Sequence, residues 1–344
     1  MKKPGSSSVL LCFILFTSLL APASFADELA GSELYSVPYL TLRNVTGDVD
    51  PDEWYGDERD SMRAGQCAFS QKSLSLLQPL SRNGLVHIPQ NWNLLEAVTE
   101  VEMPAFWAGI EKKAQGQRPL LYIHGYNTSF TKACDQAALF QANLKLERRL
   151  ILFSWPSDGS FINYPGDESD LFWSVAPLEA TLEQMVEKFG AGGFDVVAHS
   201  LGARGLFLAL VQLAHRHHEA IPLLNQLVLT APDIDAGIFQ QYIASIRPLV
   251  ANISLYVSEN DKPLALSEEV HGYPRLGQVG PHLKDLDGIQ IIDVSGVGVR
   301  SFSGHLYHLY HDSVEQDLNL LLNQGLEAHQ RDTLTEQANN RWGL

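Results

Sequence analysis

Short apolar runs alternate with longer amphipathic segments along the last two thirds of the chain. Runs suited to strands buried on both faces of a sheet occur at 119–124, 150–155, 194–198, 226–230, 253–257 and 289–294. Helical patterning occurs at 130–146, 177–189, 203–213, 237–246 and 313–322. Strands that alternate with helices predict an α/β fold with a doubly wound, mostly parallel sheet and helices on both faces.

The N-terminal third carries a weaker pattern. Residues 39–43 and 84–89 are patterned as short strands, and residues 48–63 between them are polar and rich in turn formers. Two further segments, 156–170 and 261–288, contain many glycines, prolines and polar residues and are predicted connections. The first of them is long enough to form the rim of a site.

The first residues have the pattern of a secretory signal peptide. Lys2 and Lys3 precede an apolar run at 9–20, and small residues follow it. The run is too short to predict a transmembrane span, and Cys12 lies inside it rather than at its end, which argues against lipid attachment. We therefore expect residues 1–26 to be removed, leaving a soluble protein that is periplasmic or secreted.

The remaining chain has room for one large domain with an N-terminal extension. We expect the extension at 27–117, packed on a catalytic domain at 118–344, with strands that extend or cover the edge of the main sheet. A formal net charge of −16 disfavours nucleic acid and anionic membranes as partners. Two cysteines remain after cleavage, Cys67 and Cys134, and the sequence leaves open whether they form a disulfide.

The strand at 194–198 runs into a serine and then into a helix. Strand, sharp turn and helix with Ser200 at the turn match the Gly-x-Ser-x-Gly nucleophile elbow, with Ala198 in place of the first glycine. The turn strains the backbone at the serine, so the residues two before and two after it must be small, as Ala198 and Gly202 are. On this motif alone, a serine that only caps a helix remains the alternative.

A serine nucleophile needs a base and an acid that orients the base. In this type of site the chain order is nucleophile, acid, histidine, with the last two on loops after later strands. Asp261 follows the strand at 253–257, and His305 follows the strand at 289–294. The carboxyl ends of parallel strands share one edge of the sheet, so Ser200, Asp261 and His305 are predicted to converge there.

Other residues compete for the same roles. Asp233 and Asp235 follow an earlier strand and are alternative acids, although turn or helix-cap roles would also explain them. His305 is the preferred base because Gly304 before it permits a close approach. The alternative bases are the other histidines of this region, His271, His282, His308 and His311.

The turn after residues 119–124 is the candidate oxyanion hole. It begins His124-Gly125, and we expect the backbone N–H of Tyr126 to act together with that of Leu201, the residue after the serine. The His124 side chain is expected only to brace the turn. No metal and no cofactor are predicted. The histidines at 215, 217 and 218 end a helix, where cationic side chains oppose the helix dipole and face solvent. No cysteine or carboxylate completes a metal site with the histidines at 305, 308 and 311.

Several motifs in order along the chain carry a family resemblance. They are Leu121-Tyr-Ile-His-Gly-Tyr-Asn-Thr-Ser-Phe130, Phe153-Ser-Trp-Pro-Ser157, Ala198-His-Ser-Leu-Gly202, Ala231-Pro-Asp-Ile-Asp235, Leu255-Tyr-Val-Ser258 with Asn260-Asp261, His271-Gly-Tyr-Pro-Arg275 and Gly304-His305. Over roughly 120–320, the chain resembles bacterial α/β-hydrolases of the esterase/lipase superfamily that form a family of unknown function.

The resemblance implies an α/β-hydrolase fold and a hydrolase that uses Ser200, Asp261 and His305, with Tyr126 and Leu201 at the oxyanion hole. We therefore predict an exported serine hydrolase that cleaves carboxylic esters of small molecules or lipids through an acyl-enzyme. A lipase, thioesterase or amidase with the same triad is one alternative. A non-catalytic binding protein on the same fold is another.

Overall fold

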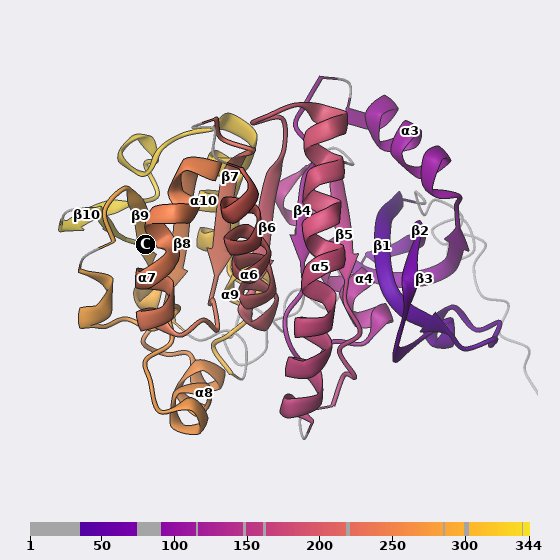
Figure 1. Cartoon of the computed structure of the whole chain (residues 1–344), viewed down its shortest axis with the longest axis horizontal. Coiled ribbons are helices and arrows are strands. Elements are labelled where there is room, and N and C mark those ends of the chain that lie inside the picture. The colour runs from indigo at the N-terminus through magenta and orange to yellow at the C-terminus, as the bar shows by residue number, and fades with distance from the viewer. Residues whose placement is uncertain are drawn as a thin grey trace, which may run out of the picture. The chain divides into compact units, whose positions relative to one another are not determined.

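Eleven strands of the described chain form one sheet (Figure 1). The computed structural model describes residues 35–73, 91–114, 116–146, 149–160, 163–217, 221–284, 286–298, 303–338 and 340–344. The predicted signal peptide and the predicted strand at 84–89 lie outside these residues. The strands are β1 Tyr35–Val45, β2 Tyr55–Ser73, β3 Asn91–Glu100, β4 Leu120–Ile123, β5 Leu150–Ser154, β6 Asp195–His199, β7 Leu224–Thr230, β8 Val250–Val257, β9 Ile289–Asp293, β10 Thr335–Ala338 and β11 Arg341–Gly343.

The order across the sheet is β10-β11-β9-β8-β7-β6-β4-β5-β1-β2-β3. The strands from β9 to β1 in this order pair in parallel, and so does β11 with β9. Antiparallel pairs occur at the two edges, between β10 and β11 and among β1, β2 and β3. The prediction of a mostly parallel sheet is therefore confirmed.

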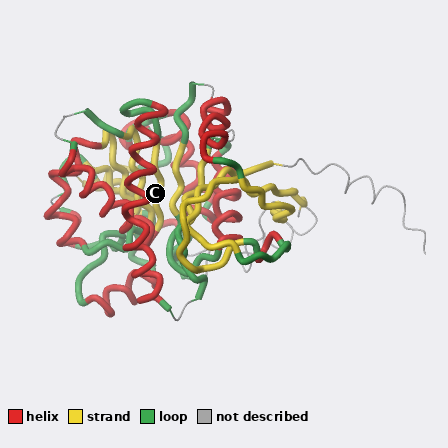
Figure 2. Tube along the Cα trace, turned by 45° about the vertical axis from the view of Figure 1, so that its right-hand side comes forward, coloured by secondary structure: helices red, strands yellow, loops and turns green. Residues whose placement is uncertain are grey.

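Helices cover both faces of the sheet, as Figure 2 shows from a second side. The helices are α3 Met103–Ala114, α4 Phe130–Leu144, α5 Tyr164–Phe189, α6 Ser200–Arg216, α7 Ala236–Ile246, α8 Lys262–His271, α9 Tyr307–Tyr310 and α10 Asp312–Gln324. One core contains the buried side chains of α3, α5, α6 and α7, and the other contains those of α4, α9 and α10. In β4, Leu121 and Ile123 enter the first core while Leu120 and Tyr122 enter the second. Burial on both faces explains why these strands are continuously apolar in sequence.

Three sequence predictions were wrong. Helix α5 begins at Tyr164, so the predicted loop at 156–170 is shorter and Pro177 lies inside the helix. Packing of apolar side chains such as Leu171 and Val175 into the core outweighs the backbone hydrogen bond that proline removes. The connection at 261–288 contains the helix α8.

The third error concerns the polar segment at 48–63, where β2 already begins at Tyr55. Its strand conformation comes from antiparallel pairing with β1 and β3, which local polarity does not reveal. Through β1, which pairs in parallel with β5, these strands extend the sheet.

Two buried features join the N-terminal strands to the rest of the fold. Cys67 of β2 and Cys134 of α4 form a disulfide with a Cα–Cα distance of 6.4 Å. The buried guanidinium of Arg43 in β1 donates to the Ser157 carbonyl at 2.8 Å and to the Thr128 carbonyl at 2.7 Å. Arg43 thereby holds the loops that follow β4 and β5. Within the described residues, no helix combines the length and apolar character needed to cross a membrane.

Candidate active site

Ser200 lies at the turn between β6 and α6. Its φ of 53° is in the left-handed region, as the strained turn of a nucleophile elbow requires. A Cβ on Gly202 would lie 2.1 Å from the His124 carbonyl oxygen, and one on Gly125 would lie 3.0 Å from the Ser200 Cβ. The elbow and the turn after β4 therefore touch, and both glycines are required by this close approach.

Asp261 and His305 form a hydrogen-bonded pair. Asp261 follows β8 and caps α8, accepting the Leu264 N–H at 3.0 Å through Oδ1. The His305 Nδ1 lies 2.7 Å from Oδ2 and 2.9 Å from Oδ1 of the fully buried Asp261 carboxylate. Because a carboxylate accepts, Nδ1–H donates, which leaves Nε2 as the proton acceptor of the imidazole.

One cavity of about 450 Å³ brings the predicted residues together. Ser200, His305 and Tyr126 line it, and Leu201 follows the serine in the first turn of α6. Asp261 lies behind His305. Within the described chain, no hydrogen bond joins the Ser200 hydroxyl to the His305 imidazole, so the structure brings these groups to one cavity without completing the contact.

The turn after β4 is held by buried polar contacts. His124 donates through Nδ1 to the Gly125 carbonyl at 2.8 Å, and its ring stacks on Trp155 with centroids 5.2 Å apart. Burial lowers the pKa of His124 to about 3, so its ring is neutral. Asn127, three residues after His124, has a φ of 57° and donates its backbone N–H to the Asp167 carboxylate at 3.1 Å. The His124 side chain thus braces the turn that carries the Tyr126 N–H.

The alternative acids have other contacts. Asp235 caps α7 by accepting the Ile238 N–H at 3.0 Å. Asp233 is buried between two guanidinium groups, 2.7 Å from Arg275 and 3.2 Å from Arg204. Burial opposes its ionisation, but the two arginines outweigh burial and lower the pKa of Asp233 to about 2. Neither carboxylate contacts His305.

The alternative bases also have other partners. His271 donates to the Ser267 carbonyl at 2.7 Å, and His308 lies 3.1 Å from the Tyr122 hydroxyl. Because α9 is only one turn long, the histidines at 305, 308 and 311 do not lie along one helix. Of the histidines in the described chain, His305 is the one paired with Asp261.

Two buried histidine rings, those of His199 and His308, were not predicted to lie beside His305. The His199 ring lies 4.5 Å from that of His305 and 4.4 Å from that of His308, and its Nε2 lies 3.2 Å from the His305 carbonyl oxygen. Burial and the neighbouring imidazoles lower the pKa of His199 well below its ordinary value. A neutral His199 that donates to this carbonyl fixes the loop that carries His305. The position of His199 directly before Ser200 was the one feature of the sequence that could have indicated this role.

Among the described residues, no three histidine, cysteine, aspartate or glutamate side chains form a group that could hold a metal ion. Of the histidines at the end of α6, His215 and His217 lie at its last turn and C-cap, and residue 218 lies outside the described chain.

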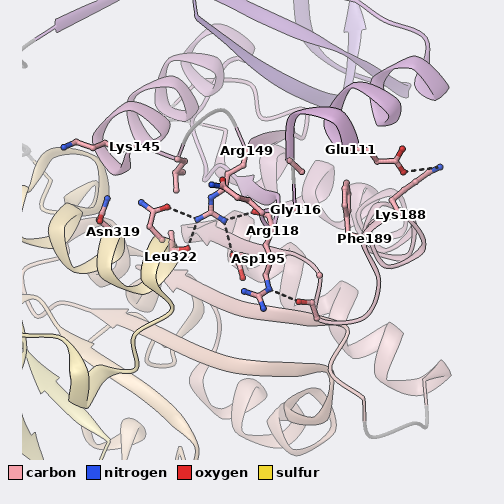
Figure 3. Close-up of a pocket in the computed structure, with 16 residues that line it drawn as sticks. Glu111, Gly116, Arg118, Lys145, Arg149, Lys188, Phe189, Asp195, Asn319 and Leu322 are labelled. Atoms are coloured by element: carbon pink, nitrogen blue, oxygen red, sulfur yellow. Dashed lines mark hydrogen bonds and ion pairs between the residues drawn. The ribbon is translucent and has the colours of Figure 1, made fainter.

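A second cavity, of about 1000 Å³, lies at the amino ends of β4, β5 and β6 (Figure 3). Its buried cation, Arg149, donates to the carbonyls of Arg118 and Leu322 at 2.7 and 2.6 Å and pairs with Asp195 at 3.3 Å. Parallel sheets bind ligands at the carboxyl ends of their strands, where Ser200 lies. The Ser200 cavity is therefore the candidate active site.

A serine at a strand-to-helix elbow, with an Asp–His pair from later strands at the same edge, is the arrangement found in α/β-hydrolases. The chain belongs to the family described as alpha/beta hydrolase of unknown function (DUF900), whose model matches residues 105–323. The recognition made from the sequence motifs is thereby confirmed. No curated protein matches the chain.

Solved structures with some likeness are distant. A predicted CIB-like hydrolase from Thermoplasma acidophilum is 12% identical with a TM-score of 0.37, covering 85% of this chain and 100% of its own. An esterase from Pyrobaculum calidifontis is 12% identical with a TM-score of 0.36, and the match covers 61% of this chain and 77% of the esterase. Carboxyl esterase 2 from Tuber melanosporum is 15% identical with a TM-score of 0.37, and the match covers 75% of this chain and 88% of the esterase. Matches at this distance carry no information about substrate.

Proposed function

We propose that the protein is an exported serine hydrolase that cleaves carboxylic esters. The observation that supports it most is the Asp261–His305 pair, with Nδ1 2.7 Å from the carboxylate, on the cavity that Ser200 lines. A buried carboxylate that fixes one imidazole nitrogen prepares the other to accept a proton from a serine.

In the proposed reaction, His305 takes the Ser200 proton as the oxygen attacks the acyl carbonyl. The N–H groups of Tyr126 and Leu201 stabilise the resulting oxyanion, each typically by about 3 kcal/mol. His305 returns the proton to the leaving alkoxide as the tetrahedral intermediate collapses to an acyl-enzyme. Water, activated by the same histidine, then releases the acid. Asp261 holds the imidazolium in both halves of the cycle.

The contact between Ser200 and His305 is completed by a side-chain movement when substrate binds, as is common for catalytic hydrogen bonds that are long in ligand-free enzymes. A largely apolar cavity of about 450 Å³ suits an acyl chain of small to medium size. The Cys67–Cys134 disulfide supports export, because disulfides persist in oxidising compartments. Cleavage after the N-terminal apolar run belongs to the same proposal.

Hydrolysis of p-nitrophenyl esters from acetate to palmitate tests the proposal, with Ser200→Ala as the matched control. Turnover by the wild type that disappears in Ser200→Ala is the expected result, and the chain-length profile separates esterase from lipase. Turnover of thioesters or amides but not of esters would change the proposed substrate class from esters to one of these acyl compounds. A folded protein that hydrolyses none of these substrates would refute the enzyme and favour a binding protein.

A further inference from the structure

The cavity at Ser200 has polar as well as apolar walls. The helix α8 lines it with apolar side chains, including Leu266 and Val270, which are 48% and 68% exposed. The helix α4 lines it with Lys132 and Gln136, neither of which the proposed catalytic steps use. These two residues are four apart in α4 and so lie on one face of the helix.

The Gln136 side chain lacks a partner. It is 5% exposed, and its Oε1 is buried without a hydrogen bond within the described chain. Leaving a buried amide unsatisfied is unfavourable, so such groups in native proteins call for an explanation. An acceptor group of a ligand in the cavity would supply a contact if the amide is turned by 180° about its terminal bond, because the NH₂ group then takes the place of the unpartnered oxygen.

Lys132 adds a positive charge to the same wall. Its ammonium donates to the Asn127 carbonyl at 2.6 Å, which uses one of its three donors. Lys132 is an exposed residue, and no carboxylate of the described chain lies within ion-pair distance of its ammonium. The carboxylate that lines the cavity, Asp233, is already paired with Arg204 and Arg275. Lys132 therefore has an unused charge and unused donors.

We infer that Lys132 and Gln136 form a subsite for an anionic oxygen group of the substrate, so that the enzyme prefers esters whose acyl or alkoxy chain ends in a carboxylate. The inference rests on the proposed function. An ammonium and an amide NH₂ both donate to carboxylate oxygens, and charge-assisted hydrogen bonds are the strong ones. In a chain with a formal net charge of −16, this local cation attracts an anion that most of the surface repels.

The test uses two pairs of esters in which an isopropyl group replaces the carboxylate. The acyl pair is the p-nitrophenyl monoester of adipic acid and p-nitrophenyl 6-methylheptanoate. The alkoxy pair is 6-(butyryloxy)hexanoate and 6-methylheptyl butyrate, followed by pH-stat. The readout is the ratio of kcat/KM for the anionic ester to that for its neutral partner, with Ser200→Ala as the blank.

In at least one pair, the wild type is expected to prefer the anionic ester by about tenfold or more. Lys132→Met abolishes this preference, Lys132→Arg keeps it, Gln136→Leu weakens it, and salt lowers it. Because loss of the Asn127 contact would slow both esters alike, the ratio isolates the charge. Lys112→Met, which removes an exposed lysine from α3, leaves the ratio unchanged. Equal rates for both esters in the wild type, or a preference that survives Lys132→Met, overturn the inference.

Calorimetric titration of adipate into Ser200→Ala gives a readout that does not depend on turnover. Binding that Lys132→Met removes supports the subsite even if no ester is hydrolysed, in which case the proposed function fails alone. Absence of binding, together with equal rates for matched esters, leaves the hydrolase in place and refutes the subsite.

Discussion

The disulfide between Cys67 and Cys134 makes a quantitative prediction about stability. It links the middle of β2 to the second turn of α4, and both cysteines are fully buried. The sequence separation is 67 residues. In the chain-entropy model, a loop of that length restricts the unfolded chain by about 4 kcal/mol at 25 °C. Removing the cross-link should therefore lower the free energy of unfolding by about that amount.

Urea unfolding followed by tryptophan fluorescence measures this loss. The oxidised wild type is compared with the reduced wild type and with Cys67→Ala/Cys134→Ala. The reduced protein isolates the cross-link, because it keeps both sulfur atoms in the core. Cys67→Ala alone should match the double variant closely, since either change opens the loop.

Equal unfolding free energies of the reduced and the oxidised protein would contradict this prediction. Two free cysteines at these positions, found by thiol titration of the denatured, unreduced protein, would contradict it as well. Either result would further remove the support that this disulfide gives to the export proposal.

Two further perturbations test the site and the core. Asp261→Asn should lower kcat by roughly 10⁴-fold with little loss of stability. Asp233→Asn should instead lower the free energy of unfolding in urea by roughly 3–5 kcal/mol, because it leaves buried arginines without a carboxylate. The reverse pattern would make Asp233 the catalytic acid. Burial lowers the pKa of His124 and of His308 to about 3, so the folded state stays neutral while the unfolded state binds protons below pH 6.5. Stability is then present above pH 6.5 and is lost towards pH 3, by about 2 kcal/mol per histidine at pH 5. His308→Gln should flatten this slope, and equal unfolding free energies at pH 7 and pH 5 would contradict it.

The central strands were predictable because burial on both faces leaves a continuous apolar run in the sequence. The run that contains Leu120 to Ile123 is an example, since alternate side chains enter the two cores. The convergence of Ser200, Asp261 and His305 on one sheet edge was also predictable, because parallel strands end at the same edge. The order of the three residues along the chain came from the sequence, and their position at one edge followed from the parallel topology of the sheet.

Features that depend on distant contacts could not be predicted. The start of α5 was missed because Pro177 looks like a first-turn residue, whereas packing against the core continues the helix on both sides of it. The strand β11 forms only by parallel pairing with β9. Likewise, the arginines that pair with Asp233 and the rings that contact His199 come from separate parts of the chain. No local sequence pattern predicts these contacts.

In the proposed mechanism, Ser200 is a nucleophile activated by His305. A fluorophosphonate reacts with such a serine, and intact mass with peptide mapping locates the adduct. We expect one adduct per chain, on the peptide that contains Ser200, with none in Ser200→Ala and slow labelling in His305→Ala. A folded wild-type protein that stays unlabelled, or that carries the adduct on another residue, would contradict the account.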